Sequence, residues 1–215
     1  MNIRGVECIP EVLDEGLLRE AVGVLAIRDP DLAAIVRRHG VPPMWARPPG
    51  YATLIRIILE QQVSLSSARA AYDRLEKAIG EITPTNFLRL DDAELKAVGF
   101  SRQKTRYGRL LAEGILDGSF NINALMDLPD DEVRARLVEL KGVGRWSADI
   151  YLLMALRRAD VWPHGDLALV RAVTRIKGLD KAPTHEEWEG LGEAWRPWRS
   201  VAARIAWFDY LDGKP

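Results

Sequence analysis

The stretch Leu140-Lys-Gly-Val-Gly-Arg-Trp-Ser-Ala148 decides how the rest of this sequence is interpreted. Two glycines, Gly142 and Gly144, bracket a single apolar residue, Val143, in a very short turn between two helical patterns. Glycine adopts backbone angles that a side chain forbids, and it lets another surface approach the backbone closely. The sequence therefore predicts a helical hairpin in which Val143 fills the space between the two helices.

This hairpin is suited to holding a phosphate group. The helix that starts near Arg145 points its N-terminus outward, where amide groups and the helix dipole favour an anion. A DNA backbone fits this description, because phosphate contacts position a duplex without reading its sequence. An ordinary turn with a glycine cap is the alternative, and proteins that only bind DNA also use such hairpins.

Helical periodicity continues on both sides of the hairpin. A capping box, Thr184-x-x-Glu187, marks a further helix start, and the proline-rich residues 41–50 form a connector. Because no pair of alternating strands with a hairpin turn is present, the expected fold class is all-α. We expect helices over residues 11–29, 31–39, 53–63, 66–79, 91–98, 101–117, 130–140, 145–158, 168–177 and 198–211.

Composition limits the possible functions. The chain has 215 residues, of which 47% are hydrophobic, but no apolar run approaches the roughly 18 residues of a membrane span. Cys8 is the single cysteine, which excludes an intrachain disulfide and a cysteine-ligated iron–sulfur cluster. The first residues carry no secretion signal, so we expect a cytoplasmic protein. Because the net charge is −1, any DNA contact must be local, for example through the basic residues between Arg102 and Arg109.

A family resemblance rests on segments spread along the chain. Val161-Trp-Pro-His-Gly-Asp-Leu-Ala-Leu-Val-Arg171, together with the hairpin, resembles the signature of the helix-hairpin-helix (HhH-GPD) DNA glycosylases. Ile58-Leu-Glu-Gln-Gln-Val-Ser-Leu65 and Gly99-Phe-Ser-Arg-Gln-Lys104 are similar to further segments of that family. Pro197-Trp-Arg-Ser200, followed by Trp207, is similar to the alkylpurine branch, 3-methyladenine DNA glycosylase II. The resemblance covers about residues 50 to 210.

The resemblance implies an architecture and an activity. It implies two packed helical subdomains with an active-site cleft between them. Residues 50–158 would carry the wedge and the hairpin, and residues 1–49 with 159–215 would carry the catalytic aspartate and the C-terminal helix. The implied activity is the flipping and hydrolytic excision of alkylated bases, of the 3-methyladenine and 7-methylguanine type, in base excision repair.

The resemblance also assigns the site residues. Asp166 would be the catalytic carboxylate, although it could also simply cap the helix that follows. The base pocket would be formed by Trp146, Trp207, Ile150 and His164. Gln62, with Gln61 beside it, would be the wedge that fills the gap left by a flipped base. The residues expected to contact the DNA backbone are Lys141, Gly142, Val143, Gly144, Arg145 and Ser147.

Trp146 indicates whether the enzyme could also cleave the DNA strand. Relatives that also cleave the strand resemble this chain but carry a lysine at this position, which forms a Schiff base with the sugar. Tryptophan has no amine, so we expect a monofunctional enzyme that uses water. Two residues depart from the alkylpurine pattern, since Gly165 stands where an acid is common and Ile150 where an aromatic residue is common. The segment before the connector also leaves no room for the N-terminal β-domain of many bacterial members.

The remaining expectations concern ligands and alternatives. We expect no required cofactor and no metal site, since His164 and Asp166 supply only two candidate ligands. A structural monovalent cation at the hairpin is compatible with the resemblance. The expected partner is double-stranded DNA with alkylated bases, bound by a monomeric, bacterial-type, nucleoid-associated protein. The alternatives are a non-enzymatic DNA-binding or damage-sensing protein, and a glycosylase for deaminated or oxidised bases.

Overall fold

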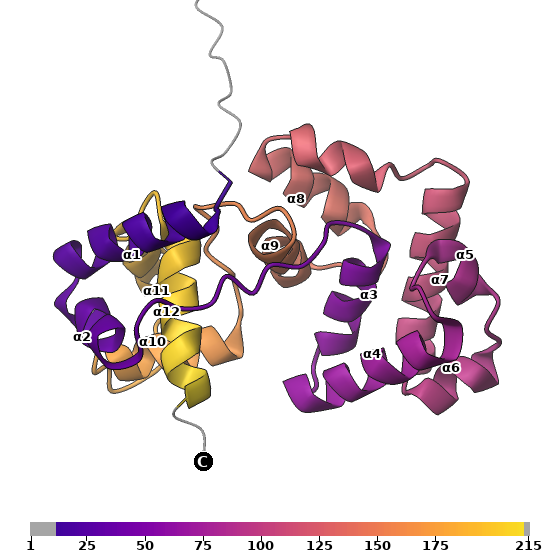
Figure 1. Ribbon diagram of the computed structural model, residues 1–215, viewed down its shortest axis with the longest axis horizontal. Coiled ribbons are helices and arrows are strands. Elements are labelled where there is room, and N and C mark those ends of the chain that lie inside the picture. The colour runs from indigo at the N-terminus through magenta and orange to yellow at the C-terminus, as the bar shows by residue number, and fades with distance from the viewer. Residues whose placement is uncertain (1–11, 213–215) are drawn as a thin grey trace, which may run out of the picture. The chain divides into compact units, whose positions relative to one another are not determined.

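A computed structural model describes residues 12–212 as α-helices joined by short loops (Figure 1). No strand occurs over these residues, and the pairing of Val12 with Arg158 is an isolated bridge. The all-α class expected from the sequence is confirmed. No helix within residues 12–212 has the length and apolar character needed to cross a bilayer.

Twelve α-helices and one short 3-10 helix, η1, make up the described chain. They are α1 (Glu15–Arg28), α2 (Pro30–His39), α3 (Tyr51–Glu60), α4 (Leu65–Ile79), α5 (Pro84–Leu88), α6 (Asp92–Val98), α7 (Arg102–Leu116), η1 (Ile122–Asp127), α8 (Asp130–Glu139), α9 (Arg145–Met154), α10 (Leu167–Ile176), α11 (His185–Glu193) and α12 (Arg199–Asp212).

The chain divides into two compact units. The terminal unit contains the described chain up to Ala46 and again from Leu152, and the central unit spans Arg47–Tyr151. The division therefore falls within α9, before the boundary expected at 158. Hydrogen bonds within the terminal unit explain this. Arg204 Nη2 donates to the carbonyl oxygen of Leu153 at 2.8 Å, and the Arg158 amide donates to that of Leu152 at 3.0 Å.

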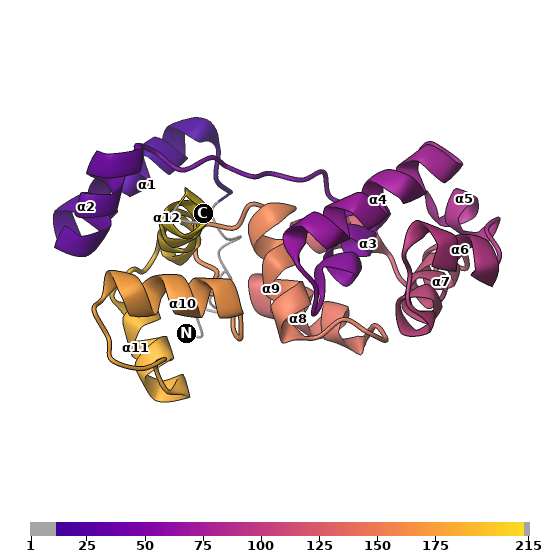
Figure 2. The ribbon, with the colours of Figure 1, turned by 90° about the horizontal axis from the view of Figure 1, so that it is seen from below.

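The terminal unit is organised around α12. This helix packs against α1, α2 and α10, and Figure 2 shows α10 alongside it. Arg204 on α12 is fully buried, and its guanidinium also donates to the carbonyl oxygens of Met44 at 2.9 Å and Ser200 at 3.0 Å. Burial lowers the pKa of Arg204 to about 10, so the side chain is still charged at neutral pH. Arg204 on α12 thus links the connector, at Met44, to the end of α9, at Leu153.

The central unit has an aromatic core. Phe87 on α5 is fully buried and lies edge-on to Tyr51 of α3, with ring centroids 5.8 Å apart, and to Phe100, at 5.4 Å. The Tyr51 hydroxyl donates to the carbonyl oxygen of Gly108 on α7 at 3.1 Å. A Cβ at Gly108 would lie 2.6 Å from the Phe87 ring, so α7 needs glycine there to pack this closely.

Several helix boundaries differ from those expected. The helix expected over 11–29 begins at Glu15, because Asp14 caps α1, and it ends at Arg28. The next helix, expected from residue 31, begins at Pro30, in the first-turn position that proline tolerates. The helix expected over 53–63 spans Tyr51–Glu60, because Gln61 already has an extended backbone and Gln62 follows with a φ of 58°. Helix α5 and η1 were not expected, since both are too short to show periodicity.

Asp29 joins three parts of the terminal unit. It caps α2 by accepting from the Asp31 and Leu32 amides, and its carboxylate accepts from Lys177 Nζ at 2.7 and 2.8 Å and from Trp195 Nε1 at 2.7 Å. Burial by itself raises the pKa of Asp29, but the hydrogen bonds from Lys177 and Trp195 outweigh it and leave the pKa below its ordinary value. Asp29 therefore stabilises the fold as a carboxylate.

The Asp29 contacts predict a loss of stability in acid. A carboxyl group with a lowered folded-state pKa contributes fully above its unfolded pKa of about 4, and this contribution disappears as pH falls through the folded pKa. Asp29→Asn should lower the free energy of unfolding at neutral pH by about 1.5–3 kcal/mol, because charge-assisted hydrogen bonds are lost. Below about pH 4 the variant should lose less further stability than the parent protein.

Urea unfolding followed by circular dichroism between neutral pH and about pH 2 would measure both effects. Asp14→Asn is the matched control, because Asp14 is exposed and caps only α1. Equal pH dependence in the Asp29→Asn variant and the parent protein would contradict the assignment.

Candidate active site

Asp166 lies where a loop turns into α10. Gly165, immediately before it, has a φ of 74°, which side chains rarely adopt. Asp166 is only 8% exposed, and its Oδ1 accepts a hydrogen bond from the Leu169 amide at 2.7 Å. The carboxylate therefore does cap α10, as the simpler interpretation of the sequence required.

Trp207 holds the same carboxylate oxygen. The indole Nε1 of this α12 residue donates to Asp166 Oδ1 at 3.3 Å, and Trp207 is itself 8% exposed. Two donors on one oxygen fix the plane of the carboxylate. The sequence gives no signal for this hydrogen bond, and the expected place of Trp207 in the base pocket stays a prediction. A helix N-cap and an indole together give a buried, oriented carboxylate.

The hairpin has the expected turn in the central unit. Gly142 has a φ of 90°, and a Cβ there would lie 2.1 Å from the ring of Tyr107 on α7. Val143 is 6% exposed and fills the turn, as the sequence predicted. The first intrahelical bond of α9 runs from the Ala148 amide to the Gly144 carbonyl at 3.0 Å. In general, the first turn of a helix has amide donors without acceptors inside the helix, and phosphate oxygens bind at such positions.

Gln61 connects the end of α3 to the hairpin. Its Nε2 donates to the Gly142 carbonyl oxygen at 2.8 Å and to Ser147 Oγ at 2.9 Å. Lys104 Nζ donates to the carbonyl oxygens of Leu59 at 2.8 Å and Gln61 at 2.9 Å, and burial lowers the pKa of this lysine. The end of α3, the start of α7 and the hairpin thus form one hydrogen-bonded unit.

These contacts bear on three sequence-based expectations. Gln61 uses its amide to support the hairpin, and its place beside the wedge stays a prediction. Ser147 is buried and its hydroxyl accepts from Gln61, so the expected phosphate contact of Ser147 stays a prediction that concerns its amide. Among the basic residues expected to offer a local DNA contact, Lys104 and Arg109 already donate to backbone carbonyl oxygens, and Arg109 Nη2 does so to Leu90 at 2.8 Å.

Gln62 is placed differently from its neighbour. It is exposed and follows α3 with a φ of 58°, a conformation that few non-glycine residues adopt. Backbone strain of this kind concentrates at functional sites. The structure therefore presents one glutamine to solvent at a tight turn, while the preceding glutamine anchors that turn.

The other predicted residues differ in exposure. Trp146 is half-buried in the first turn of α9, whereas Ile150 is 3% exposed and belongs to the core. The Arg145 side chain is 58% exposed and Lys141 is exposed, so both present positive charge beside the hairpin. His164 is half-exposed in the loop before Asp166. The pocket roles of Trp146, Ile150 and His164 stay predictions.

The two adjacent glutamines allow a matched experiment. Gln61→Ala should destabilise the central unit by about 1–3 kcal/mol, because the buried Ser147 hydroxyl and Gly142 carbonyl lose their donor. DNA binding should weaken with it, since the hairpin loses its support. Gln62→Ala should leave stability within about 0.5 kcal/mol, since Gln62 is exposed.

Urea unfolding and the fluorescence anisotropy of a labelled duplex would separate the two glutamine variants. Loss of stability in Gln62→Ala, or its absence in Gln61→Ala, would refute the division of roles.

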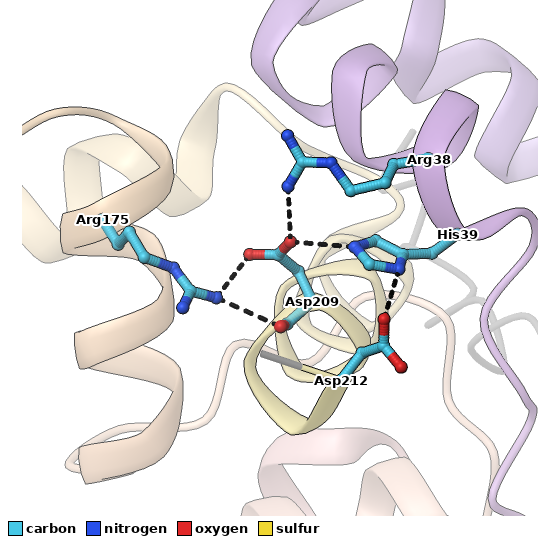
Figure 3. A pocket seen from close by; sticks show the side chains of 5 residues that line it. All are labelled: Arg38, His39, Arg175, Asp209 and Asp212. Carbon is cyan, nitrogen blue, oxygen red and sulfur yellow. Dashed lines mark hydrogen bonds and ion pairs between the residues drawn. The ribbon is translucent and has the colours of Figure 1, made fainter. Parts of the chain in front are cut away.

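A polar cavity of about 360 Å³ lies elsewhere in the terminal unit (Figure 3). Asp209 accepts from Arg175 Nη2 at 2.6 Å and lies 3.1 Å from His39 Nε2. The acidic side chain of Asp209 is thus paired with basic side chains, and these contacts link α2, α10 and α12 around the cavity. Its lining residues are Arg38, His39, Arg175, Asp209 and Asp212, which include none of the predicted site residues.

Comparison with known proteins agrees with this geometry. Residues 55–197 match the HhH-GPD superfamily base excision DNA repair protein family. The YfjP protein of Bacillus subtilis is 26% identical over 184 residues, which are 82% of this chain and 64% of YfjP. DNA-3-methyladenine glycosylase 1 of Schizosaccharomyces pombe is 30% identical over 161 residues, 73% of this chain and 71% of the relative. The chain thus spans less than two thirds of YfjP.

The fold comparison points the same way. The structure of the S. pombe 3-methyladenine DNA glycosylase Mag1 in complex with abasic DNA superposes with a TM-score of 0.80. It is 28% identical, and the match covers 87% of this chain and 95% of Mag1. The family match spans the Gln61 turn, the hairpin and the Asp166 loop together. The chain therefore belongs to the HhH-GPD superfamily of base excision DNA repair proteins.

Proposed function

We propose that this protein is a monofunctional DNA glycosylase that excises alkylated bases, of the 3-methyladenine and 7-methylguanine type, by hydrolysing the N-glycosidic bond. The observation that carries the proposal is the Asp166 carboxylate, which is buried and oriented by the Leu169 amide and the Trp207 indole. The relatives named for 3-methyladenine excision support the same substrate class. Mag1, bound to abasic DNA, supports DNA as the partner, and we propose that this DNA is double-stranded.

The chemistry follows from charge development. Breaking an N-glycosidic bond builds positive charge on the sugar, and a fixed carboxylate in a site poor in water stabilises it most. Asp166 meets this requirement and can also orient the attacking water. A base alkylated at a ring nitrogen already carries positive charge, so it departs without a strong general acid. Trp146 supplies no amine, so no Schiff base forms there.

We assign binding of the DNA backbone to the hairpin. The amides at the start of α9, with Lys141 and Arg145, would bind phosphates, and Gln62 would occupy the gap left by the flipped base. A monovalent cation between hairpin and phosphate is compatible with the Gly142 carbonyl, because a carbonyl oxygen has a second lone pair beside the one used by Gln61. The protein would act as a monomer in the cytoplasm and need no other cofactor.

A panel of duplex oligonucleotides with one lesion each tests the proposal. We expect release of free 3-methyladenine and 7-methylguanine, no strand cleavage, and no adduct trapped by borohydride. Binding without release of any base would instead indicate a damage-sensing protein. Release of only deaminated or oxidised bases would overturn the substrate class, and a trapped adduct would overturn the monofunctional mechanism.

A further inference from the structure

Three metal-binding side chains meet beside the loop that carries Asp166. His164 belongs to this loop, and His185 and Glu189 lie one turn apart on α11. His164 Nδ1 is 3.8 Å from Glu189 Oε1, and His185 Nδ1 is 3.9 Å from the same oxygen. The ligand atoms of all three residues lie within 4.8 Å of one another. The sequence alone paired His164 with Asp166, but the fold supplies two different partners.

The separations match an ion better than direct contacts. The two measured distances exceed those of hydrogen bonds. Ligands held at about 2.0–2.1 Å by a tetrahedral zinc ion lie roughly 3.3–3.5 Å apart. The two measured pairs would each close by about half an ångström, and any pair at the 4.8 Å limit of the cluster by roughly 1.4 Å. The His185 and Glu189 side chains are 69% and 40% exposed, so both can rotate by these amounts. The rings of His164 and His185 contact each other, with centroids 4.9 Å apart. This ring contact does not account for the Glu189 carboxylate, which lies near both rings.

The ligand chemistry selects a class of metal. Two imidazoles and one carboxylate suit Zn²⁺ and similar divalent transition metals, whereas Mg²⁺ and Ca²⁺ favour sites made of oxygen alone. The local charge also favours a cation. Helix α11 carries four glutamates among nine residues and no lysine or arginine.

We propose that His164, His185 and Glu189 bind one Zn²⁺-type divalent metal ion that fastens the Asp166 loop to α11. The ion would have a structural role, separate from catalysis, and would link a residue two positions before Asp166 to a helix whose first turn is exposed. The bound ion would thereby reduce local opening of the loop. This inference does not depend on the proposed glycosylase activity, because metal binding is measured on the protein alone.

Isothermal titration of the metal-depleted protein with Zn²⁺ alone tests the site. The Cys8→Ser background removes the single thiol of the chain as a competing ligand. We expect one equivalent to bind with a micromolar or tighter Kd. His185→Gln and Glu189→Gln should each weaken binding at least about 100-fold, since even outer-shell partners cost up to that much. Glu186→Gln, the same change at an exposed neighbour on α11, should bind like the parent.

Hydrogen exchange tests the fastening. Zn²⁺ should raise protection of the amides of residues 164–166 in the parent and not in Glu189→Gln. The absence of one-to-one binding, or equal binding in Glu189→Gln and Glu186→Gln, would overturn the metal site. Binding without added protection would overturn the fastening role. Circular dichroism of each variant checks that the fold is kept, and loss of base excision with metal binding retained would bear only on the proposed function.

Discussion

Asp166→Asn is expected to abolish base release from methylated DNA while the fold and duplex binding are kept. Asparagine caps helices as well as aspartate does, and its Oδ1 can still accept from the Leu169 amide and the Trp207 indole. The substitution therefore removes the negative charge and little else. Loss of one group aimed at the developing charge costs at least about 100-fold in rate, or about 2.7 kcal/mol.

Single-turnover release of free base from a methylated duplex would measure the Asp166→Asn effect. The anisotropy of the same duplex would measure its binding. Asp180→Asn is the control, because it makes the same chemical change at an exposed loop position. Release from the Asp166→Asn protein at the parental rate would refute the catalytic role, and parallel loss of stability would show that Asp166 acts mainly as a cap.

Gly142→Ala is expected to have the second large effect, on stability and DNA binding together. The new Cβ would lie 2.1 Å from the Tyr107 ring, whose hydroxyl is held by Gln103. The φ of 90° adds strain that glycine avoids. A left-handed conformation costs roughly 1–2 kcal/mol and overpacking about 1–3 kcal/mol, so the variant should lose about 2–5 kcal/mol. Moving the Gly142 carbonyl also breaks the bond from Gln61.

Gly144→Ala is the matched control for Gly142→Ala, because it replaces the other glycine of the same hairpin. A Cβ at Gly144 would meet no atom within 4 Å, and its φ is not positive, so stability should change by less than about 1 kcal/mol. Urea unfolding and duplex anisotropy of both variants would give the comparison. Equal destabilisation by the two alanines would show that the close approach of Tyr107 does not determine the hairpin.

Local signals explain what could be predicted. The capping box at Thr184, the cap at Ser101 and the terminating glycine at Gly80 each mark a helix end, and all three occur in the structure. Such signals involve residues a few positions apart, so they are readable without the fold. Short elements are harder to predict, because α5 has a cap at Thr83 but too few residues to show helical periodicity. Helix α5 has five residues, and the reason for it is the buried Phe87 between distant rings.

The sequence by itself determined the all-α class, the glycine turn of the hairpin and the cap at Asp166, because each depends on backbone angles and neighbours along the chain. Only the tertiary structure decided which distant side chains serve these features. Gln61 supports a hairpin 81 residues later, and Trp207 holds a carboxylate 41 residues earlier. Hydrogen bonds across such separations depend on how helices pack, and helical periodicity specifies which face is buried but not which residue it meets.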